Sequence, residues 1–336
     1  MTDRNILALS DLVFHSGSQI EMLQPLSDEN LKRVTPSTQE IQIGTEFSNA
    51  DYLRIARVLD VAPNAVLRRW GLGCNLDFLK YFPNVKRLRL SGGYDSWEPL
   101  SLVASHLVDL SIDTYSIGTN MGDLLKDFSQ LRKLSFNFHR DGGIKEVPEF
   151  DNVFPALALL PNLEVLFFHS VKLPNVDTLG MMLKLRSLSM VQCSIKDLSG
   201  VGMAKGLVHL HLGYMMNKNI EFLESNQKLQ YLSLAYLSQI ETIPSLEKHF
   251  DLRRVVLTSM KGLTNLSNIA LAPNLEDLIL DEEKYLKASD LECFSGHPHL
   301  KHVWTNMGSV RKDKAVDELL GLPRLGARSR FDFKFD

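Results

Sequence analysis

Residues 185–234 contain the pattern on which the architecture of this chain depends: LRSLSMVQCSIKDLSGVGMAKGLVHLHLGYMMNKNIEFLESNQKLQYLSL. Three times a leucine is followed by two residues, a second leucine, one residue and a third apolar side chain, starting at Leu185, Leu207 and Leu229. The last two apolar positions are two residues apart, so they share one face of a β-strand. A helix would need apolar residues three and four apart, and that spacing does not continue. The pattern therefore predicts one short strand in every 22 residues.

The same spacing extends in both directions from this stretch. Eleven units start at positions 67, 85, 107, 131, 163, 185, 207, 229, 252, 275 and 300. The first unit is read as Leu67, Trp70 and Leu72, and the last as Leu300 and Val303 with Thr305 in the third place. A single unit cannot bury its own apolar face, whereas stacked units bury a continuous core. We therefore expect a solenoid with parallel strands along one side.

This spacing resembles the leucine-rich repeat family, whose units carry the same leucine triplet at a period of 20 to 29 residues. The resemblance runs from Leu67 to Thr305. It implies an α/β solenoid that winds as a right-handed superhelix, with a parallel concave sheet and caps at both ends. Its short units are similar to those of bacterial internalins and of nuclear phosphatase-regulating repeat proteins.

The segments between strands are too short for a full helix of about 11 residues each. We expect 3₁₀ or extended segments on the convex side, with Ile195, Leu198 and Val201 pointing inward at a spacing of three. The family's Asn or Cys ladder occurs only at Asn75 and Cys193. The remaining turns need other hydrogen-bond partners, which predicts irregular coils.

The ends of the chain read as caps, since a solenoid would otherwise expose its last apolar cross-section. We predict an N-terminal cap over residues 1–64, a solenoid over 65–307 and a C-terminal cap over 308–336. Ser27 and Ser48 are candidate helix N-caps, with Leu53 inward in the second helix, and residues 41–43 read as a strand. Residues 314–320 predict a helix that ends at Gly321. Phe331, Phe333 and Phe335 alternate with polar residues and are expected to cover the last coil or to fray.

Side chains that alternate with the leucines are expected on the concave face, and Arg69 is read as one of them. Along the chain, these concave-face side chains form a mixed-charge region, then an aromatic and histidine-rich centre, then an acidic spot. The centre suggests a binding surface, because aromatic side chains anchor protein interfaces. The alternative is that these rings pack among themselves on the sheet. The insertion at 139–155, at the rim of this face, is either a ligand contact or a tolerated loop. The predicted partner-binding residues are Arg87, Arg89, Lys133, Phe138, Phe167, His169, His209, His211, Tyr214, Tyr231, Tyr236, Asp277, Asp281 and Trp304.

No metal, cofactor or catalytic site is predicted. His169, His209 and His211 share a face but are spread over several coils, and no carboxylate or thiolate at ligand spacing completes a metal set with His297, His299 and His302. The three cysteines are widely spaced and suit neither a disulfide framework nor a metal knuckle. No glycine cluster matches a phosphate-binding loop, and no nucleophile elbow is present in the sequence.

Composition narrows the partner class. The 336 residues carry 37 Lys and Arg against 40 Asp and Glu, a net charge of -3, and this balance argues against nucleic acid as a partner. No apolar run is long enough to cross a bilayer, and residues 1–14 lack the pattern of a secretory signal. We therefore expect a monomer in the cytoplasm, with no membrane partner, while non-classical export stays open.

The sequence thus predicts a non-catalytic recognition module that binds a protein on its concave face. The resemblance to bacterial repeat proteins implies an immunity, antitoxin-type, effector or regulatory role. The alternative is a specificity or regulatory subunit of a separately encoded enzyme, such as a phosphatase or ubiquitin ligase. A self-associating structural role is a third possibility.

Overall fold

The computed structural model describes residues 18–115, 120–138, 150–326 and 333–336. The chain forms two compact units, of which one is Phe14–Val171 and the other consists of Lys172–Asp336 together with Met1–Val13. The boundary between them falls inside the predicted solenoid, so the predicted domain limits stay a prediction. Each unit is described by itself below.

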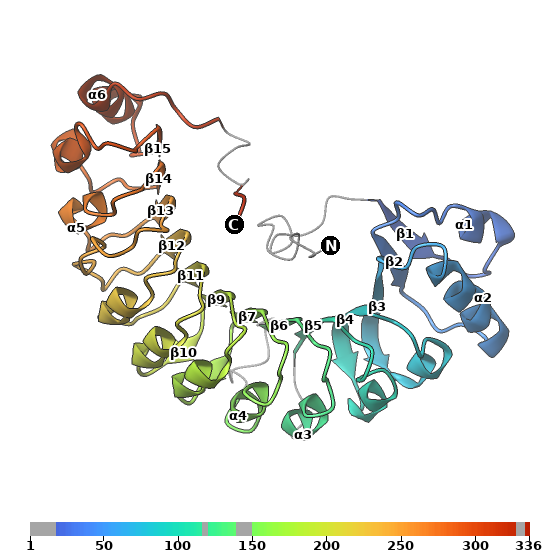
Figure 1. Ribbon diagram of the computed structural model, residues 1–336. Helices are drawn as coiled ribbons and strands as arrows, with labels where there is room; N and C mark the ends of the chain where they lie inside the picture. Colours follow the sequence, from blue (N-terminus) through green and yellow to red (C-terminus); the bar gives the residue numbers. More distant parts are fainter. Residues whose placement is uncertain (1–17, 116–119, 139–149, 327–332) are drawn as a thin grey trace. The chain divides into compact units, whose positions relative to one another are not determined.

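The unit of residues 14–171 contains seven parallel strands in the order of the chain, with short helical segments on the other side of the coil (Figure 1). The strands are β1 (Gln19–Met22), β2 (Glu40–Ile43), β3 (Val66–Cys74), β4 (Arg87–Tyr94), β5 (Asp109–Thr114), β6 (Lys133–Phe138) and β7 (Val165–His169). The helical segments are α1 (Asp28–Lys32), α2 (Asn49–Leu59), η2 (Asp77–Tyr81), η3 (Glu98–Leu102), α3 (Met121–Leu125) and α4 (Val153–Leu157).

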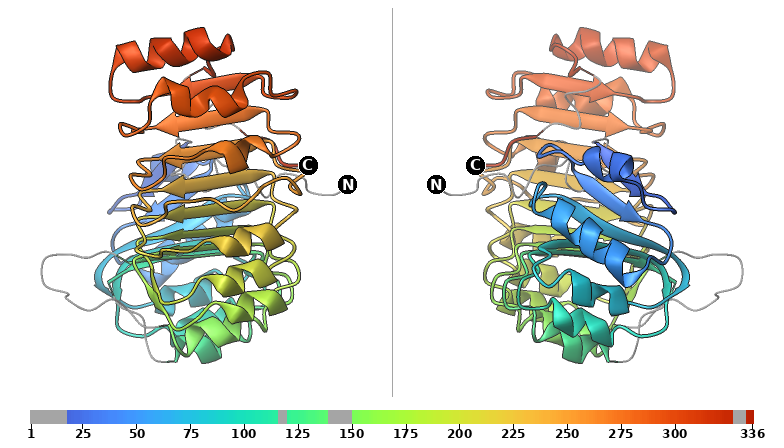
Figure 2. Two further views of the ribbon diagram at one scale, coloured as in Figure 1. Left: turned by 90° about the vertical axis from the view of Figure 1, so that its left-hand side faces the viewer. Right: turned by 90° about the vertical axis from the view of Figure 1, so that its right-hand side faces the viewer.

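The unit of residues 172–336 repeats the same coil with six parallel strands in chain order, and a two-stranded pair lies beside them. Figure 2 shows its strands as a stacked series of arrows. The strands are β9 (Ser187–Val191), β11 (His209–Gly213), β12 (Tyr231–Ala235), β13 (Arg254–Thr258), β14 (Asp277–Asp281), β15 (His302–Thr305) and the pair β8 (Lys172–Leu173) and β10 (Ser194–Ile195). The helical segments are η4 (Asp177–Met181), η5 (Ser199–Met203), η6 (Glu221–Ser225), α5 (Ser267–Ala270), η7 (Ala288–Phe294) and α6 (Val310–Leu320).

The strand register confirms the predicted repeat in both units. The second leucine of one unit lies opposite the second leucine of the next, as Leu188, Leu210 and Leu232 show, and all three side chains are fully buried. The third positions follow the same rule. The short 3₁₀ segments on the far side of the coil are also as predicted, and Ile195, Leu198 and Val201 are buried.

The predicted register of the first repeat is wrong by three residues. Leu67 lies opposite Leu88, which is a second position, so Arg69 takes the core place opposite Leu90. The Arg69 side chain is 1% exposed and donates to the carbonyl oxygen of Ile43 at 3.1 Å and to the Glu46 carboxylate at 2.7 Å. A charged side chain is tolerated there because these acceptors compensate for its lost hydration.

Backbone groups replace the missing side-chain ladder in the 172–336 unit. The residue that follows the strand adopts a left-handed conformation after β9, β11, β12, β13 and β14, at Gln192, Tyr214, Tyr236, Ser259 and Glu282. In that conformation the N–H of each of the first four donates to the last strand residue of the next coil, for example from Tyr214 to Ala235 at 2.9 Å. Two of these turns also use a side chain: Glu283 accepts the Met260 N–H at 2.8 Å, and the Cys193 thiol donates to the Val191 carbonyl oxygen at 3.4 Å. These turns are therefore regular where the sequence predicted irregular ones.

The short helical segments begin at polar side chains that cap the backbone. Asn175, Asp197 and Asn219 each accept the N–H two residues later, which starts the next 3₁₀ turn. These turns pack closely, since a Cβ at Gly200 would lie 2.5 Å from the Val176 carbonyl carbon.

Replacing Gly200 by alanine is therefore expected to force η5 away from η4. Because the clash is with backbone, overpacking of this kind costs about 2 kcal/mol of unfolding free energy. Urea denaturation followed by circular dichroism measures it. Gly93→Ala is the control, since its Cβ would meet nothing within 4 Å. Equal stability of the two variants would contradict the packing argument.

The predicted cap elements form within the described residues. Ser27, Ser48 and Ser309 cap α1, α2 and α6 through their side chains, and Gly321 ends α6 in a left-handed conformation. The prediction that Leu53 faces inward is wrong, because Leu53 is 49% exposed and its neighbour Tyr52 is buried instead. Residues 1–17, most of the insertion at 139–155 and Phe331 lie outside the described residues.

Candidate functional site

The predicted mixed-charge region, in the 14–171 unit, consists of ion pairs. Arg89 lies 2.9 Å from one oxygen of the fully buried Glu40 carboxylate, and Arg68 lies 3.7 Å from the other. Arg87 pairs with Asp109 at 3.4 Å. The two predicted binding arginines are thus partly neutralised, while Lys133 is half-buried on the same sheet face.

The same unit carries three predicted aromatic or imidazole contacts. Phe167 and His169 are half-buried at alternating positions of β7, as predicted for the open face. Phe138 was predicted there too, and this is wrong, because its side chain is 2% exposed and packs edge-on against Phe150 at 5.6 Å. The reason is that β6 continues through Phe138, which places it on the core side of the pleat.

In the 172–336 unit, the two histidines of β11 are neutral members of a hydrogen-bonded row. His209 Nδ1 lies 2.8 Å from the Ser187 hydroxyl, and His211 Nδ1 lies 2.8 Å from the Ser233 hydroxyl. Burial lowers the pKa of His209 to about 3 and that of His211 to about 4. Both imidazoles are therefore uncharged at neutral pH.

Two tyrosines form an aromatic ridge at the end of the strands β11 and β12. The rings of Tyr214 and Tyr236 are stacked with centroids 4.1 Å apart, and Tyr214 is 49% exposed. The Tyr236 hydroxyl donates to the Glu282 carboxylate at 2.9 Å, which fixes its ring and raises its pKa. Met216, next to the ridge in sequence, is 73% exposed.

The prediction that Asp277 forms part of an open acidic spot is wrong. Its carboxylate is buried and accepts from Arg254 Nη2 at 2.7 Å and from Arg254 Nε at 3.0 Å. Its other oxygen lies 2.9 Å from His302 Nδ1. Asp281 accepts from Asn306 at 3.0 Å and is half-buried, as is Trp304. Within this cluster Asp277 is therefore a structural ion-pair partner rather than a free acid.

The C-terminal residues lie on this sheet face (Figure 1). Phe333 contacts Tyr231 with ring centroids 5.3 Å apart, and Phe335 contacts His209 at 5.8 Å. The expectation that the phenylalanines cover the last coil is therefore wrong for these two. The earlier part of the tail reaches β15, where Arg324 forms a bridge with Val303.

A row of polar side chains just before the strands holds the same tail. Arg253 Nη2 donates to the Lys334 carbonyl oxygen at 2.7 Å and lies 3.3 Å from an Asp336 carboxylate oxygen. Gln230 accepts the Asp336 N–H at 3.0 Å, and Arg186 donates to the Asp336 carbonyl oxygen at 3.0 Å. The sequence analysis missed this row. All its members follow the first leucine of their unit, and that shared position is the signal that identifies them.

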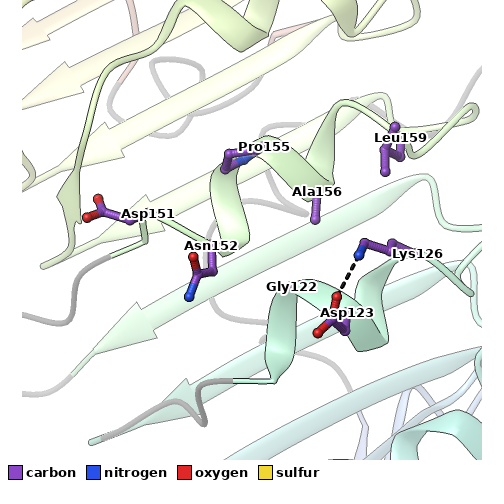
Figure 3. Close-up of a pocket in the computed structure, with 8 residues that line it drawn as sticks. All are labelled: Gly122, Asp123, Lys126, Asp151, Asn152, Pro155, Ala156 and Leu159. Carbon is purple, nitrogen blue, oxygen red and sulfur yellow. Dashed lines mark hydrogen bonds and ion pairs between the residues drawn. The ribbon is translucent and has the colours of Figure 1, made fainter.

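A shallow pocket lies between α3 and α4 in the 14–171 unit (Figure 3). Asp123 and Lys126, which line it, form an ion pair with each other, at 2.5 Å. A Cβ at Gly122 would lie 2.3 Å from the Asn152 carbonyl oxygen, so glycine permits the close approach of the two helices. The lining combines this ion pair with Asp151, Asn152 and apolar side chains, and it suggests no particular ligand chemistry.

Among the residues that the structure describes, no group of three or more His, Cys, Asp or Glu side chains is arranged to hold a metal ion. Over the same residues, every helix is too short or too polar to cross a membrane.

Comparisons with known proteins identify the fold. An internalin from Listeria monocytogenes is 15% identical, with 88% of each chain covered and a TM-score of 0.51. The Toll chain of the Drosophila Toll–Spätzle complex is 13% identical over 86% of this chain and 44% of its own, with a TM-score of 0.54. A Leptospira interrogans leucine-rich repeat protein is 15% identical over 91% and 93% of the two chains, with a TM-score of 0.46. No family model and no curated protein matches the sequence. The chain has the leucine-rich repeat fold.

Proposed function

We propose that the chain is a non-catalytic protein-recognition module that binds a protein partner on the sheet face of its 172–336 unit. The ridge formed by the exposed Tyr214 and the half-buried Tyr236 carries this proposal. Tyrosine rings supply a large contact area at low cost in conformational entropy and are enriched at protein interfaces. The core does not require Tyr214, since half of its surface is open to solvent.

Two further observations support a binding role over catalysis. The imidazoles of His209 and His211 are neutral and bonded to the hydroxyls of Ser187 and Ser233. The open face of a parallel sheet offers an extended preformed surface, whereas catalysis needs a site that excludes water. The role of an immunity or effector protein and that of a specificity subunit differ only in the partner.

Replacing Tyr214 and Met216 together by serine is expected to weaken partner binding at least tenfold, since hot-spot truncations at interfaces cost about 2 kcal/mol. The partner is captured from lysate of the source cell on the immobilised chain, purified, and titrated by calorimetry. Both side chains are exposed, so thermal unfolding should stay unchanged.

The matched control is Leu183→Ser with Phe250→Ser, which removes two exposed apolar side chains away from the ridge. A partner that tolerates the ridge variant but is lost with this control would place the binding site elsewhere. Capture of a toxin or of an enzyme would separate the immunity role from the subunit role.

A further inference from the structure

The last four residues bind the sheet face in the manner of a ligand. Phe333 and Phe335 are half-buried and alternate with the exposed Lys334 and Asp336, as expected for an extended segment that presents one side to a surface. The two phenylalanines also contact each other, with ring centroids 4.8 Å apart. The segment therefore places an aromatic pair against the floor formed by His209 and Tyr231.

The site that receives this segment combines three kinds of recognition. Phe333 lies over the guanidinium carbons of Arg253 and Arg254, at 4.9 and 5.2 Å, which are cation–π contacts. The backbone of the segment is held by Arg253, Gln230 and Arg186, and such contacts do not depend on side-chain identity. The Asp336 carboxylate pairs with Arg253. The exposed Lys334 side chain leaves the position between the aromatics free to vary.

We propose that the sheet face over β11, β12 and β13 is a binding site for an extended segment of another protein with the order aromatic, any residue, aromatic, acidic, and that residues 333–336 occupy it in cis as an autoinhibitory ligand. A partner segment of this chemistry must displace the tail before it binds. This inference rests on the proposed function, and adds to it the class of segment recognised and its regulation.

The contacts favour a displaceable segment over a fixed part of the core. The backbone of Lys334 and Asp336 bonds to the side chains of Arg253, Gln230 and Arg186 rather than to the backbone of a neighbouring strand. A tethered segment acts at an effective concentration of about 1 mM, so a tail with a dissociation constant of about 0.1 mM weakens a competing segment about tenfold.

The test uses the full chain and a fluorescein-labelled, amidated peptide with the sequence of residues 330–336, RFDFKFD. Fluorescence anisotropy is measured with the wild type and with Phe333→Ser/Phe335→Ser, whose tail no longer covers the face. We expect the double variant to bind the peptide about tenfold more tightly than the wild type. Adding Arg253→Ala to the double variant should weaken binding at least tenfold again.

Two controls make the result specific. A peptide with serine in place of the last two phenylalanines should not bind, and Phe250→Ser, an exposed aromatic outside the site, should leave binding as in the wild type. Circular dichroism and thermal unfolding confirm that every variant is folded. Equal binding by the wild type and the double variant, no binding by either, or no effect of Arg253→Ala would overturn the inference. Loss of a captured partner with the ridge variant, despite a failed peptide test, would leave the proposed function standing.

Discussion

Replacing Asp277 by alanine is expected to lower the free energy of unfolding by about 3–5 kcal/mol, because it leaves a buried charge without its partner. The Arg254 side chain is 5% exposed, and its Nε and Nη2 both donate to one Asp277 oxygen. Water cannot replace that acceptor at such a site, so the guanidinium would stay desolvated or the strands β13 and β14 would separate. Urea denaturation followed by circular dichroism measures the loss.

The double replacement Arg254→Met/Asp277→Leu is the informative control. It removes both charges and keeps apolar volume, and replacement of a buried ion pair in this way is often close to neutral. We expect the double variant to be at least 2 kcal/mol more stable than Asp277→Ala, an estimate that follows from the same comparison. If Asp277→Ala alone cost less than 1 kcal/mol, the pair would be solvated and the argument would fail.

Acidification from pH 7.5 to 5 is expected to destabilise the 172–336 unit through its buried histidines. His209 has a pKa of about 3 in the folded chain against an ordinary value of 6.5, so between these values the unfolded chain binds a proton that the folded chain does not. Stability from this group is therefore present above pH 6.5 and lost as the pH falls below it. At 1.36 kcal/mol per pH unit the loss by pH 5 is about 2 kcal/mol. His211, with a pKa of about 4, adds a similar loss, because pH 5 still lies above its folded pKa and below its ordinary value of 6.5.

Glu283 acts in the opposite direction. Burial raises the pKa of its carboxyl group from 4.5 to about 7, so the folded chain holds a proton that the unfolded chain releases between these values. The stability that protonated Glu283 contributes to the folded chain is fully present below pH 4.5 and is lost as the pH rises through 7. The wild type is therefore expected to show a shallow net pH dependence.

Variants separate the two contributions. His209→Asn retains a polar group near Ser187 and should reduce the acid-induced loss by about 2 kcal/mol, whereas Glu283→Gln should increase it by a similar amount. Urea midpoints at pH 7.5, 6.25 and 5 measure the slopes. Parallel pH profiles for the wild type and His209→Asn would show that His209 titrates normally and is not desolvated.

The aromatic ridge and the tail site divide the sheet face of the 172–336 unit into two parts. Tyr214 and Tyr236 lie where the strands end, whereas Arg186, Gln230 and Arg253 lie just before the strands begin. A partner that contacts both parts must displace residues 333–336, and this lowers its affinity. A partner that contacts only the ridge binds without displacing them. Comparing the captured partner with wild type and the Phe333→Ser/Phe335→Ser variant distinguishes these cases.

The leucine spacing by itself determined the strands, their parallel stacking and the short segments between them. The reason is that side-chain alternation and coil length are local, periodic properties, which can be recognised directly in the amino-acid sequence. The same alternation predicted Phe167 and His169 between inward residues, and both side chains are half-buried at alternating positions of β7.

Tertiary structure decided what the period does not encode. Arg69 fills a core place because Glu46 and the Ile43 carbonyl approach it, and Phe138 is buried because β6 extends one inward position further than the leucine triplet predicts. Residues 333–336 contact side chains 81 to 150 positions away, such as Arg253 and Arg186. Such contacts depend on which surfaces the folded coils bring together, and no local spacing in the sequence reports them.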